Sequence, residues 1–185
     1  MRIIGTVGLP GSGKGEAASV ARELDIPVVT MGDVIREACR ARGLDPTDHH
    51  GEVAVALRQE EGEAAIAERS LSMIREKLTE HDVVLVDGIR SDTEVERFEE
   101  AFGSDFVLIA IDAPFEVRKK RIERRKRDDP NVESLKDRDE RELNFGMGEA
   151  IADADMTIEN TKTIEAYHKQ IRKVLEEGEY NDLQR

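Results

Sequence analysis

The residues best suited to chemistry stand near the start of the chain, in the run Gly8-Leu-Pro-Gly-Ser-Gly-Lys14. This run matches G-x-x-x-x-G-K, in which glycines permit backbone conformations that a Cβ would forbid, so that the loop amides point at an anion. Lys14 adds a full positive charge for the β- and γ-phosphates of a nucleotide. The pattern therefore predicts a phosphate-binding loop, made by Gly8, Leu9, Pro10, Gly11, Ser12, Gly13 and Lys14 and continued by Gly15 and Glu16.

The stretches on both sides of this loop support the prediction. Arg2–Val7 is a short apolar run with β-branched residues, which is typical of a buried strand. Gly15–Leu24 has a helical pattern, and a helix N-terminus would add its partial positive charge at the loop. The alternative is an ordinary glycine-rich turn, but the strand–loop–helix order is the context that distinguishes a phosphate loop from such a turn.

The residue after the lysine departs from the usual pattern. Ser or Thr is common there, because its hydroxyl binds Mg²⁺, whereas this chain has Gly15 followed by Glu16. The pattern G-x-P-G-S-G-K-G resembles the adenylate kinase branch of nucleoside monophosphate kinases, in which glycine is common at this place and Thr tends to follow. The resemblance implies that Mg²⁺ is held through water, with Glu16 as an outer-shell group.

Composition restricts the class of protein. The 185 residues suit one domain with small inserts, and a net charge of −13 argues against a general binder of nucleic acid or anionic membrane. Arginines outnumber lysines 19 to 9 among many acidic residues, which would suit a high-salt cytoplasm. The single Cys39 fits a reducing compartment. Because no apolar run is long enough to span a membrane and the chain enters a strand at once, we expect a cytoplasmic protein.

The rest of the chain alternates apolar runs with helical patterns. This alternation predicts an α/β fold with a parallel sheet covered on both faces and ligands beyond the carboxyl ends of the strands. We expect strands at 27–30, 83–86, 106–111 and 156–159, and helices at 31–42, 52–80 with a break near Gly62, 91–102, 114–127, 137–144 and 163–177. Residues 45–51 are expected to form a turn and 128–136 a loop.

The stretch Val29-Thr-Met-Gly-Asp-Val-Ile-Arg36 is similar to the S-T-G-D-x-x-R stretch of adenylate kinases. In that family the Thr and Arg hold the phosphate of the acceptor monophosphate. The resemblance assigns Thr30 and Arg36 to acceptor binding, with Gly32 between them. A capped amphipathic helix with an arginine facing solvent is the alternative.

Asp87-Gly-Ile-Arg90 resembles the D-G-F-P-R stretch of the same family with one residue missing. The resemblance implies that Asp87 holds Mg²⁺ through water and that Arg90 clamps the acceptor phosphate. Glu94 then stands where adenylate kinases carry a Gln that reads adenine. Because an ionised carboxylate only accepts hydrogen bonds, we expect AMP to be a poor acceptor and guanine or a non-nucleotide to be preferred. Alternatively, Glu94 is a surface residue of its helix.

Residues 118–127 include eight basic side chains in ten. Alone this would suggest a nucleic-acid patch, but the run follows a predicted buried strand and precedes a polar loop, where nucleoside monophosphate kinases carry lid arginines. Arg121 and Arg125 are four residues apart and share a helix face. Beyond the loop, Arg138 and Arg141 can close on the phosphates from the other side. Arginines suit this work because a transferring phosphoryl needs positive charge on several oxygens at once.

The stretch Ala154-Asp-Met-Thr-Ile-Glu-Asn-Thr161 resembles the A-D-x-x-I-x-N-x ending of dephospho-CoA kinases, in which the loop lies against the donor adenine. Asn160 and Thr161 are the corresponding candidates, and a plain helix-capping arrangement is the alternative.

The whole chain resembles P-loop monophosphate kinases, and most of all an archaeal group related to adenylate kinase and dephospho-CoA kinase. This implies a three-layer sandwich with a five-stranded parallel sheet, an acceptor-binding insert at about 31–80 and a short lid at about 127–137. It also implies that the protein binds ATP and Mg²⁺ and transfers the γ-phosphoryl group to a small acceptor. The favoured acceptor is a nucleoside monophosphate. A dephospho-CoA kinase, an ATPase acting on a partner and a nucleotide-binding regulator are the alternatives. The acceptor and the oligomeric state stay open.

Overall fold

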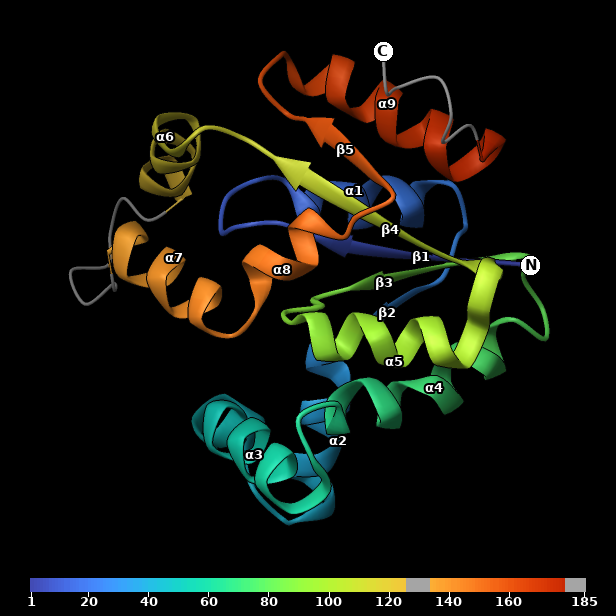
Figure 1. The fold of residues 1–185 in the computed structure, drawn as a ribbon, viewed down its shortest axis with the longest axis vertical. Helices are drawn as coiled ribbons and strands as arrows, with labels where there is room; N and C mark the ends of the chain where they lie inside the picture. Colours follow the sequence, from blue (N-terminus) through green and yellow to red (C-terminus); the bar gives the residue numbers. More distant parts are fainter. Residues whose placement is uncertain (126–133, 179–185) are drawn as a thin grey trace.

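The computed structural model describes residues 1–125 and 134–178 (Figure 1). The strands in this part are β1 (Arg2–Val7), β2 (Val28–Thr30), β3 (Val83–Asp87), β4 (Phe106–Asp112) and β5 (Met156–Glu159). The helices are α1 (Lys14–Glu23), α2 (Met31–Ala41), α3 (Pro46–Glu61), α4 (Ala65–Lys77), α5 (Asp92–Phe102), α6 (Phe115–Arg125), α7 (Leu135–Asn144), α8 (Met147–Ala152) and α9 (Ile164–Glu177), with a short 3₁₀ helix η1 (Gly103–Asp105).

These strands form one parallel sheet in the order β2-β3-β1-β4-β5. The predicted α/β fold with a five-stranded parallel sheet is therefore confirmed. The chain leaves β1 toward β2 and β3 on one side, and later adds β4 and β5 on the other side. Where the winding direction reverses, the carboxyl ends of the strands leave a crevice for ligands. Gly8 follows β1 and Asp87 ends β3, so both lie at this crevice.

Helices cover both faces of the sheet, as Figure 1 shows. Side chains along β1 alternate between the faces, so that Ile3 and Ile4 are both fully buried but in different apolar clusters. The cluster around Ile4 includes residues of α1 and α9, and the cluster around Ile3 includes residues of α2, α3, α4, α5 and α8. Full burial on both faces explains why these strands are continuous apolar runs in the sequence.

The segment between β2 and β3 consists of three helices with short connections, and the predicted turn at 45–51 is wrong, because α3 begins at Pro46. Asp45 accepts a hydrogen bond from the Thr47 amide at 2.8 Å and caps α3, and Pro46 occupies the first turn of this helix. Proline suits that place because its missing N–H would have no helical partner there. The break near Gly62 is confirmed, because this glycine ends α3 with a φ of +98°.

The segment after α6 differs from the sequence prediction in two ways. Helix α7 begins at Leu135, two residues earlier than expected, and α8 was not predicted at all. Gly146, with a φ of +94°, separates α7 from α8, and Met147 and Ala150 of α8 are fully buried. Most of the expected loop and lid falls on 126–133, outside the described residues.

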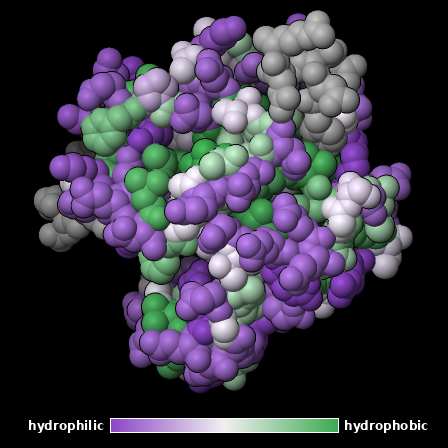
Figure 2. Space-filling view, viewed as in Figure 1, coloured by the Kyte–Doolittle hydropathy of each residue, from purple (hydrophilic) through white to green (hydrophobic). Residues whose placement is uncertain are grey.

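The surface is dominated by charged and polar side chains, as the space-filling view shows for one face (Figure 2). Among the described residues, none of the helices combines the length and the apolar character that a membrane crossing needs.

Candidate active site

The phosphate loop has the backbone that the sequence predicts. Gly8 and Gly13 have φ angles of +148° and +125°, which side-chain-bearing residues rarely adopt. A Cβ at Gly8 would also collide with the carbonyl oxygen of Ile111, and one at Gly13 with the amide of Asn160. Because Gly13 caps α1 without a side chain, the first amides of this helix remain available to an anion.

Lys14 lies partly buried against the carbonyl oxygens of the loop. Its Nζ donates to the carbonyl oxygen of Gly8 and, at 3.4 Å, to that of Leu9. Burial lowers the pKa of Lys14, whereas the nearby carboxylates of Glu142 and Asp87 oppose this effect. The amine of Lys14 therefore lies at the place where the sequence predicts phosphate binding.

Three side chains hold the phosphate loop from behind. Asn160 donates from Nδ2 to the carbonyl oxygen of Ser12 at 2.7 Å, and Arg121 donates to the same oxygen at 3.1 Å. Tyr167 donates its hydroxyl to the carbonyl oxygen of Gly13 at 3.0 Å. These contacts hold the carbonyl oxygens of Ser12 and Gly13 in place, and within the loop the Ser12 amide donates to the carbonyl oxygen of Leu9 at 3.1 Å. The hydroxyl of Ser12 is buried and has no hydrogen-bond partner within the described part of the chain, which suits a ligand oxygen.

Three cavities follow one another along the carboxyl edge of the sheet. The first, which we call the loop cavity, has a volume of about 210 Å³ and is lined by Lys14, Arg90, Arg138 and Glu142 among others. The second, the outer cavity, has about 310 Å³ and shares Gly11 and Gly13 with the loop cavity. The third, the apolar cavity, has about 390 Å³ and shares Gly88 and Arg90 with the loop cavity. The loop cavity thus joins the other two.

The outer cavity contains part of the predicted adenine and lid residues. Glu16, Arg121 and Asn160 line it, whereas Thr161 is exposed and does not. Arg121 binds the Asn160 side chain at 3.0 Å, so these two residues come together as supports of the loop. Lys162 and Ile164 also line this cavity, and no sequence pattern singled them out.

The first predicted acceptor group forms a local network at the start of α2. Thr30 caps this helix by accepting from the Asp33 amide, and Arg36 donates to Thr30 at 3.2 Å and to Asp33 at 2.5 Å. Partial burial acts to raise the pKa of Asp33, but hydrogen bonds from Thr30 and Arg36 outweigh this effect and lower the pKa. Gly32 lines the apolar cavity, whereas Thr30 and Arg36 do not. Asp33 is thus the counter-ion that an acceptor phosphate would have to replace at Arg36.

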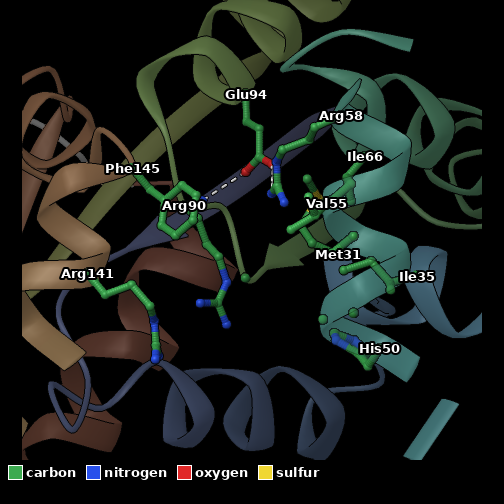
Figure 3. A pocket seen from close by; sticks show the side chains of 14 residues that line it. Met31, Ile35, His50, Val55, Arg58, Ile66, Arg90, Glu94, Arg141 and Phe145 are labelled. Carbon is green, nitrogen blue, oxygen red and sulfur yellow. Dashed lines mark hydrogen bonds and ion pairs between the residues drawn. The ribbon is translucent and has the colours of Figure 1, made fainter. Parts of the chain in front are cut away.

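Glu94 lies in the wall of the apolar cavity, not on the surface. Its side chain is 1% exposed, so the surface-residue alternative is wrong. One carboxylate oxygen accepts from Arg58 Nη2 at 3.0 Å and the other from the Arg90 amide at 2.9 Å (Figure 3). Burial raises the pKa of Glu94, and these two contacts oppose the rise. Arg58 was missed in the sequence because a single arginine in a helical stretch carries no pattern.

Asp87 is placed as the sequence predicts, at the end of β3 and close enough to Lys14 to affect its pKa. Thr6 donates its hydroxyl to Asp87 at 3.4 Å. The described residues contain no cluster of three or more His, Cys, Asp or Glu that could bind a metal alone. One carboxylate beside a phosphate loop nevertheless fits Mg²⁺, which takes one or two protein carboxylates together with water and phosphate oxygens.

The arginines predicted to bind phosphate from α6 and α7 have different positions in the structure. Arg138 lines the loop cavity and Arg141 lines the apolar cavity. Arg125 ends α6, and its side chain lies outside the described residues. Arg118 is buried beneath the phosphate loop and pairs with Asp139 of α7. Within the basic run at 118–127, Arg118 is therefore a buried anchor, whereas Arg121 and Arg124 line the outer cavity.

We expect Gly15→Thr to bind Mg²⁺·ATP at lower Mg²⁺ concentrations than the wild type. A Cβ at Gly15 meets no atom of the rest of the protein within 4 Å, so the position opens onto free space that a side chain can occupy. Its hydroxyl would supply the usual metal ligand, and one added contact is worth about 1 kcal/mol, or roughly fivefold in the half-saturating Mg²⁺ concentration. A Mg²⁺ titration of ATP binding measures this, with Gly15→Ala as the matched control. An equal shift in both variants would contradict the hydroxyl's role.

Comparison with known proteins fixes the family. A UPF0200 protein from Halobacterium salinarum is 56% identical to this chain over 176 residues, which are 95% of this chain and 93% of that protein. The chain belongs to the UPF0200 family. A family model described as an AAA domain also matches residues 7–136, so the chain is a member of that family of P-loop NTPases. The predicted relationship to an archaeal group with a phosphate loop is confirmed.

Solved structures confirm the fold. TT1252 from Thermus thermophilus superposes with a TM-score of 0.66 at 21% identity, covering 95% of this UPF0200 chain and 97% of that protein. Shikimate kinase from Acinetobacter baumannii, solved in complex with shikimate, superposes with a TM-score of 0.58 at 18% identity, covering 97% and 95%. At such identities the likeness concerns the fold alone. The protein has the fold of P-loop kinases.

Proposed function

We propose that this protein transfers the γ-phosphoryl group of ATP, bound with Mg²⁺, to a small acceptor in the apolar cavity. The observation that carries the proposal is that Gly88 and Arg90 line both the loop cavity and the apolar cavity. A phosphate held by Lys14 and an acceptor in the apolar cavity would therefore meet at Arg90. Such adjacency is what transfer between two bound molecules requires.

The residues around the loop cavity suit a transferring phosphoryl group. Lys14, Arg90 and Arg138 all line this cavity. Bound Mg²⁺ would neutralise further charge on the phosphate oxygens, and Asp87 with intervening water is the group that would hold it. The protein needs no covalent nucleophile, because positioning and charge stabilisation carry this class of reaction.

The apolar cavity suits an acceptor with an apolar or aromatic body and an anionic group. Met31, Ile35 and Phe145 supply apolar walls, and Arg90 and Arg141 bring positive charge (Figure 3). A nucleoside monophosphate has both features and is the first candidate class. Arg58 in the same wall pairs with Glu94, and Arg90 also contacts the carboxylate of Glu142.

An assay of ADP formation over a panel of acceptors tests the proposal. The panel includes AMP, GMP, CMP and UMP, together with dephospho-CoA and shikimate as hydroxyl acceptors. We expect at least one compound to raise the rate well above ATP hydrolysis alone and to appear as a phosphorylated product. ATP hydrolysis that no acceptor changes would favour the ATPase alternative, and binding of ATP without turnover would favour a nucleotide-binding regulator.

A hydroxyl acceptor, as in dephospho-CoA kinases, is the second candidate because of Glu142. This buried residue lines the loop cavity and contacts Arg90 at 3.3 Å, so a carboxylate lies near the place of transfer. An attacking hydroxyl must lose a proton, which such a carboxylate can accept, whereas a monophosphate needs no base. A Glu142→Gln variant that loses transfer to dephospho-CoA but keeps any transfer to monophosphates would support this candidate.

Glu94→Gln tests whether Glu94 reads the acceptor base. If the carboxylate accepts from the N1–H and 2-amino groups of guanine, the substitution lowers GMP turnover and raises AMP turnover, so that the AMP-to-GMP ratio of kcat/KM rises by tenfold or more. The measurement compares kcat/KM for AMP and GMP in the wild type and the variant. An unchanged ratio would mean that Glu94 only accepts hydrogen bonds from Arg58 and the Arg90 amide and does not contact the acceptor base.

A further inference from the structure

Arg118, in the first turn of α6, and Asp139, a buried residue of α7, form a buried ion pair. We infer that this pair is a positioning device, which fixes α7 against the phosphate loop and thereby places Arg138 in the loop cavity and Arg141 in the apolar cavity. The inference rests on the proposed function for its effect on turnover, but its effect on α7 is independent of any activity.

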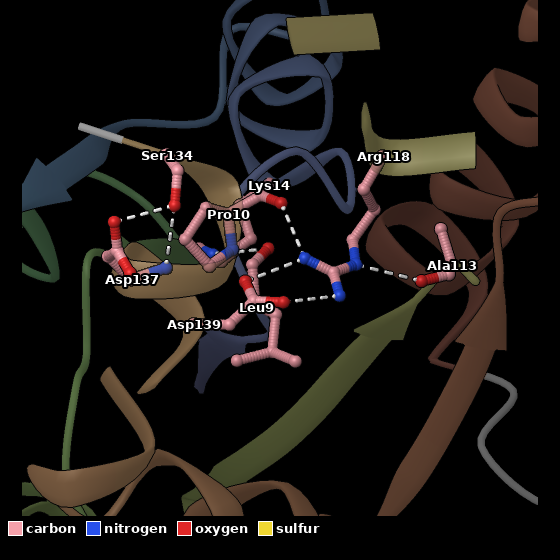
Figure 4. Close-up of polar contacts among 8 residues, drawn as sticks. All are labelled: Leu9, Pro10, Lys14, Ala113, Arg118, Ser134, Asp137 and Asp139. Atoms are coloured by element: carbon pink, nitrogen blue, oxygen red, sulfur yellow. Dashed lines mark hydrogen bonds and ion pairs between the residues drawn. The ribbon is translucent and has the colours of Figure 1, made fainter. Parts of the chain in front are cut away.

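The contacts of Arg118 join three parts of the protein (Figure 4). Its Nη1 and Nη2 donate to the two carboxylate oxygens of Asp139 at 2.8 and 2.7 Å. Nη1 also donates to the carbonyl oxygen of Pro10 in the phosphate loop at 3.1 Å, and Nε donates to that of Ala113 after β4 at 3.0 Å. The side chains of Arg118 and Asp139 are only 5% and 13% exposed. A bidentate, buried pair of this kind fixes direction as well as distance.

Helix α7 depends on such contacts because it has little apolar surface to bury. Its buried residues are Leu135, Asp139 and Glu142, so two of the three are carboxylates. Glu142 contacts Arg90 with a single hydrogen bond at 3.3 Å, and the Arg90 side chain is half exposed. The contact between Asp139 and Arg118 is shorter, bidentate and buried. It is therefore the principal anchor of α7.

Fixing Asp139 also fixes how α7 is rotated about its axis. Successive helical residues point about 100° apart, so the neighbours of Asp139 have their directions set by this single contact. Arg138 then reaches the loop cavity and Arg141 the apolar cavity. The same guanidinium holds the Pro10 carbonyl of the phosphate loop. One arginine thus holds both the phosphate loop, where ATP would bind, and α7, which carries a residue of the proposed acceptor cavity.

Asp139→Asn tests the inference, because asparagine keeps the shape and removes the charge. We expect kcat of ATP turnover to fall at least tenfold while the KM for ATP changes less than threefold, since Arg138 acts on charge that develops during transfer. Hydrogen exchange at the amides of residues 135–144 should rise, whereas exchange in β1, β3 and β4 stays unchanged. Glu140→Gln is the matched control, because it removes one carboxylate from the exposed side of the same helix.

A double-mutant cycle separates positioning from general stability. If Asp139 acts through Arg138, then Arg138→Ala lowers kcat much less in the Asp139→Asn background than in the wild type. The double variant Arg118→Met/Asp139→Leu keeps apolar packing and guards against a failure to fold, because buried ion pairs are often replaceable without loss of stability. We expect it to melt near the wild type and yet show rapid exchange in α7.

The outcomes are distinguishable. Wild-type exchange in α7 in both Asp139→Asn and the double variant would overturn the inference, even if no acceptor is ever found. If Arg138→Ala lowers kcat by the same factor in the Asp139→Asn background as in the wild type, Asp139 does not act through Arg138 and that part of the inference is overturned. Increased exchange in α7 without any ATP turnover in the wild type would instead leave the positioning pair supported and contradict the proposed function.

Discussion

Replacing Lys14 with alanine is expected to lower the rate of phosphoryl transfer by at least about 10²-fold, which corresponds to on the order of 3 kcal/mol of transition-state stabilisation. Lys14 lines the loop cavity, close to loop carbonyl oxygens and to the carboxylates of Glu142 and Asp87. Because the side chain is partly buried, its charge would act on a bound phosphate more strongly than a charge in bulk water would. The melting temperature should stay close to that of the wild type, because the apolar clusters do not include this residue.

Lys120→Ala is the matched control for this experiment. Lys120 is exposed on α6, so its loss removes one positive charge at no cost to the site. The measurement is kcat/KM for ATP with the best acceptor of the panel, together with the melting temperature. Wild-type turnover in Lys14→Ala, or an equal loss in Lys120→Ala, would contradict the assignment of Lys14 to catalysis.

Replacing Arg58 with methionine is expected to lower the free energy of unfolding by about 3 kcal/mol at neutral pH. The substitution leaves the carboxylate of Glu94, which is 1% exposed, without its charged partner. Breaking a buried pair in this way costs about 3–5 kcal/mol, and we expect the lower end because the Arg58 side chain is 17% exposed. Chemical denaturation measures the change.

The stability of Arg58→Met should also depend on pH in a defined direction. Burial already raises the pKa of Glu94, and the loss of Arg58 removes a contact that opposes this rise. The folded state then holds a proton that the unfolded state has released, so stability falls as pH rises from the unfolded pKa through the folded pKa. The variant should therefore be closest to the wild type near pH 5 and fall behind toward pH 8.

Two variants control the Arg58 experiment. Arg69→Met breaks an exposed pair with Glu61, with side chains 42% and 38% exposed, and should cost less than about 1 kcal/mol. Adding Glu94→Gln to Arg58→Met removes the unpaired charge, so part of the lost stability and most of the pH dependence should disappear. A loss of stability that is the same at every pH would contradict this explanation.

Local sequence was enough to predict the phosphate loop and the sheet. Gly8 and Gly13 are dictated by their own backbone conformation, and parallel strands buried on both faces must be apolar throughout. The turn expected around Pro46 was wrong because proline and aspartate favour turns and helix starts alike, and only the following packing of α3 decides between them.

Contacts distant in sequence explain what the residues alone did not show. Arg118 looked like one of many basic residues, but its partner Asp139 lies 21 residues away. Glu94 had the pattern of either a base-reading or a surface residue, and its burial follows from Arg58, 36 residues earlier on another helix. Side-chain burial and ion pairing of this kind depend on the assembled fold, since charged residues have no periodicity that marks their partners.

The central claim is that a phosphoryl group passes between two adjoining cavities, and label transfer in a single turnover tests it most directly. The protein, in excess over ATP labelled in its γ-phosphate, is mixed with Mg²⁺ and each acceptor of the panel, and the products are separated. We predict that the label appears in one acceptor faster than in inorganic phosphate, and that Lys14→Ala abolishes this product. Label found only in inorganic phosphate, with every acceptor at saturating concentration, would contradict the account.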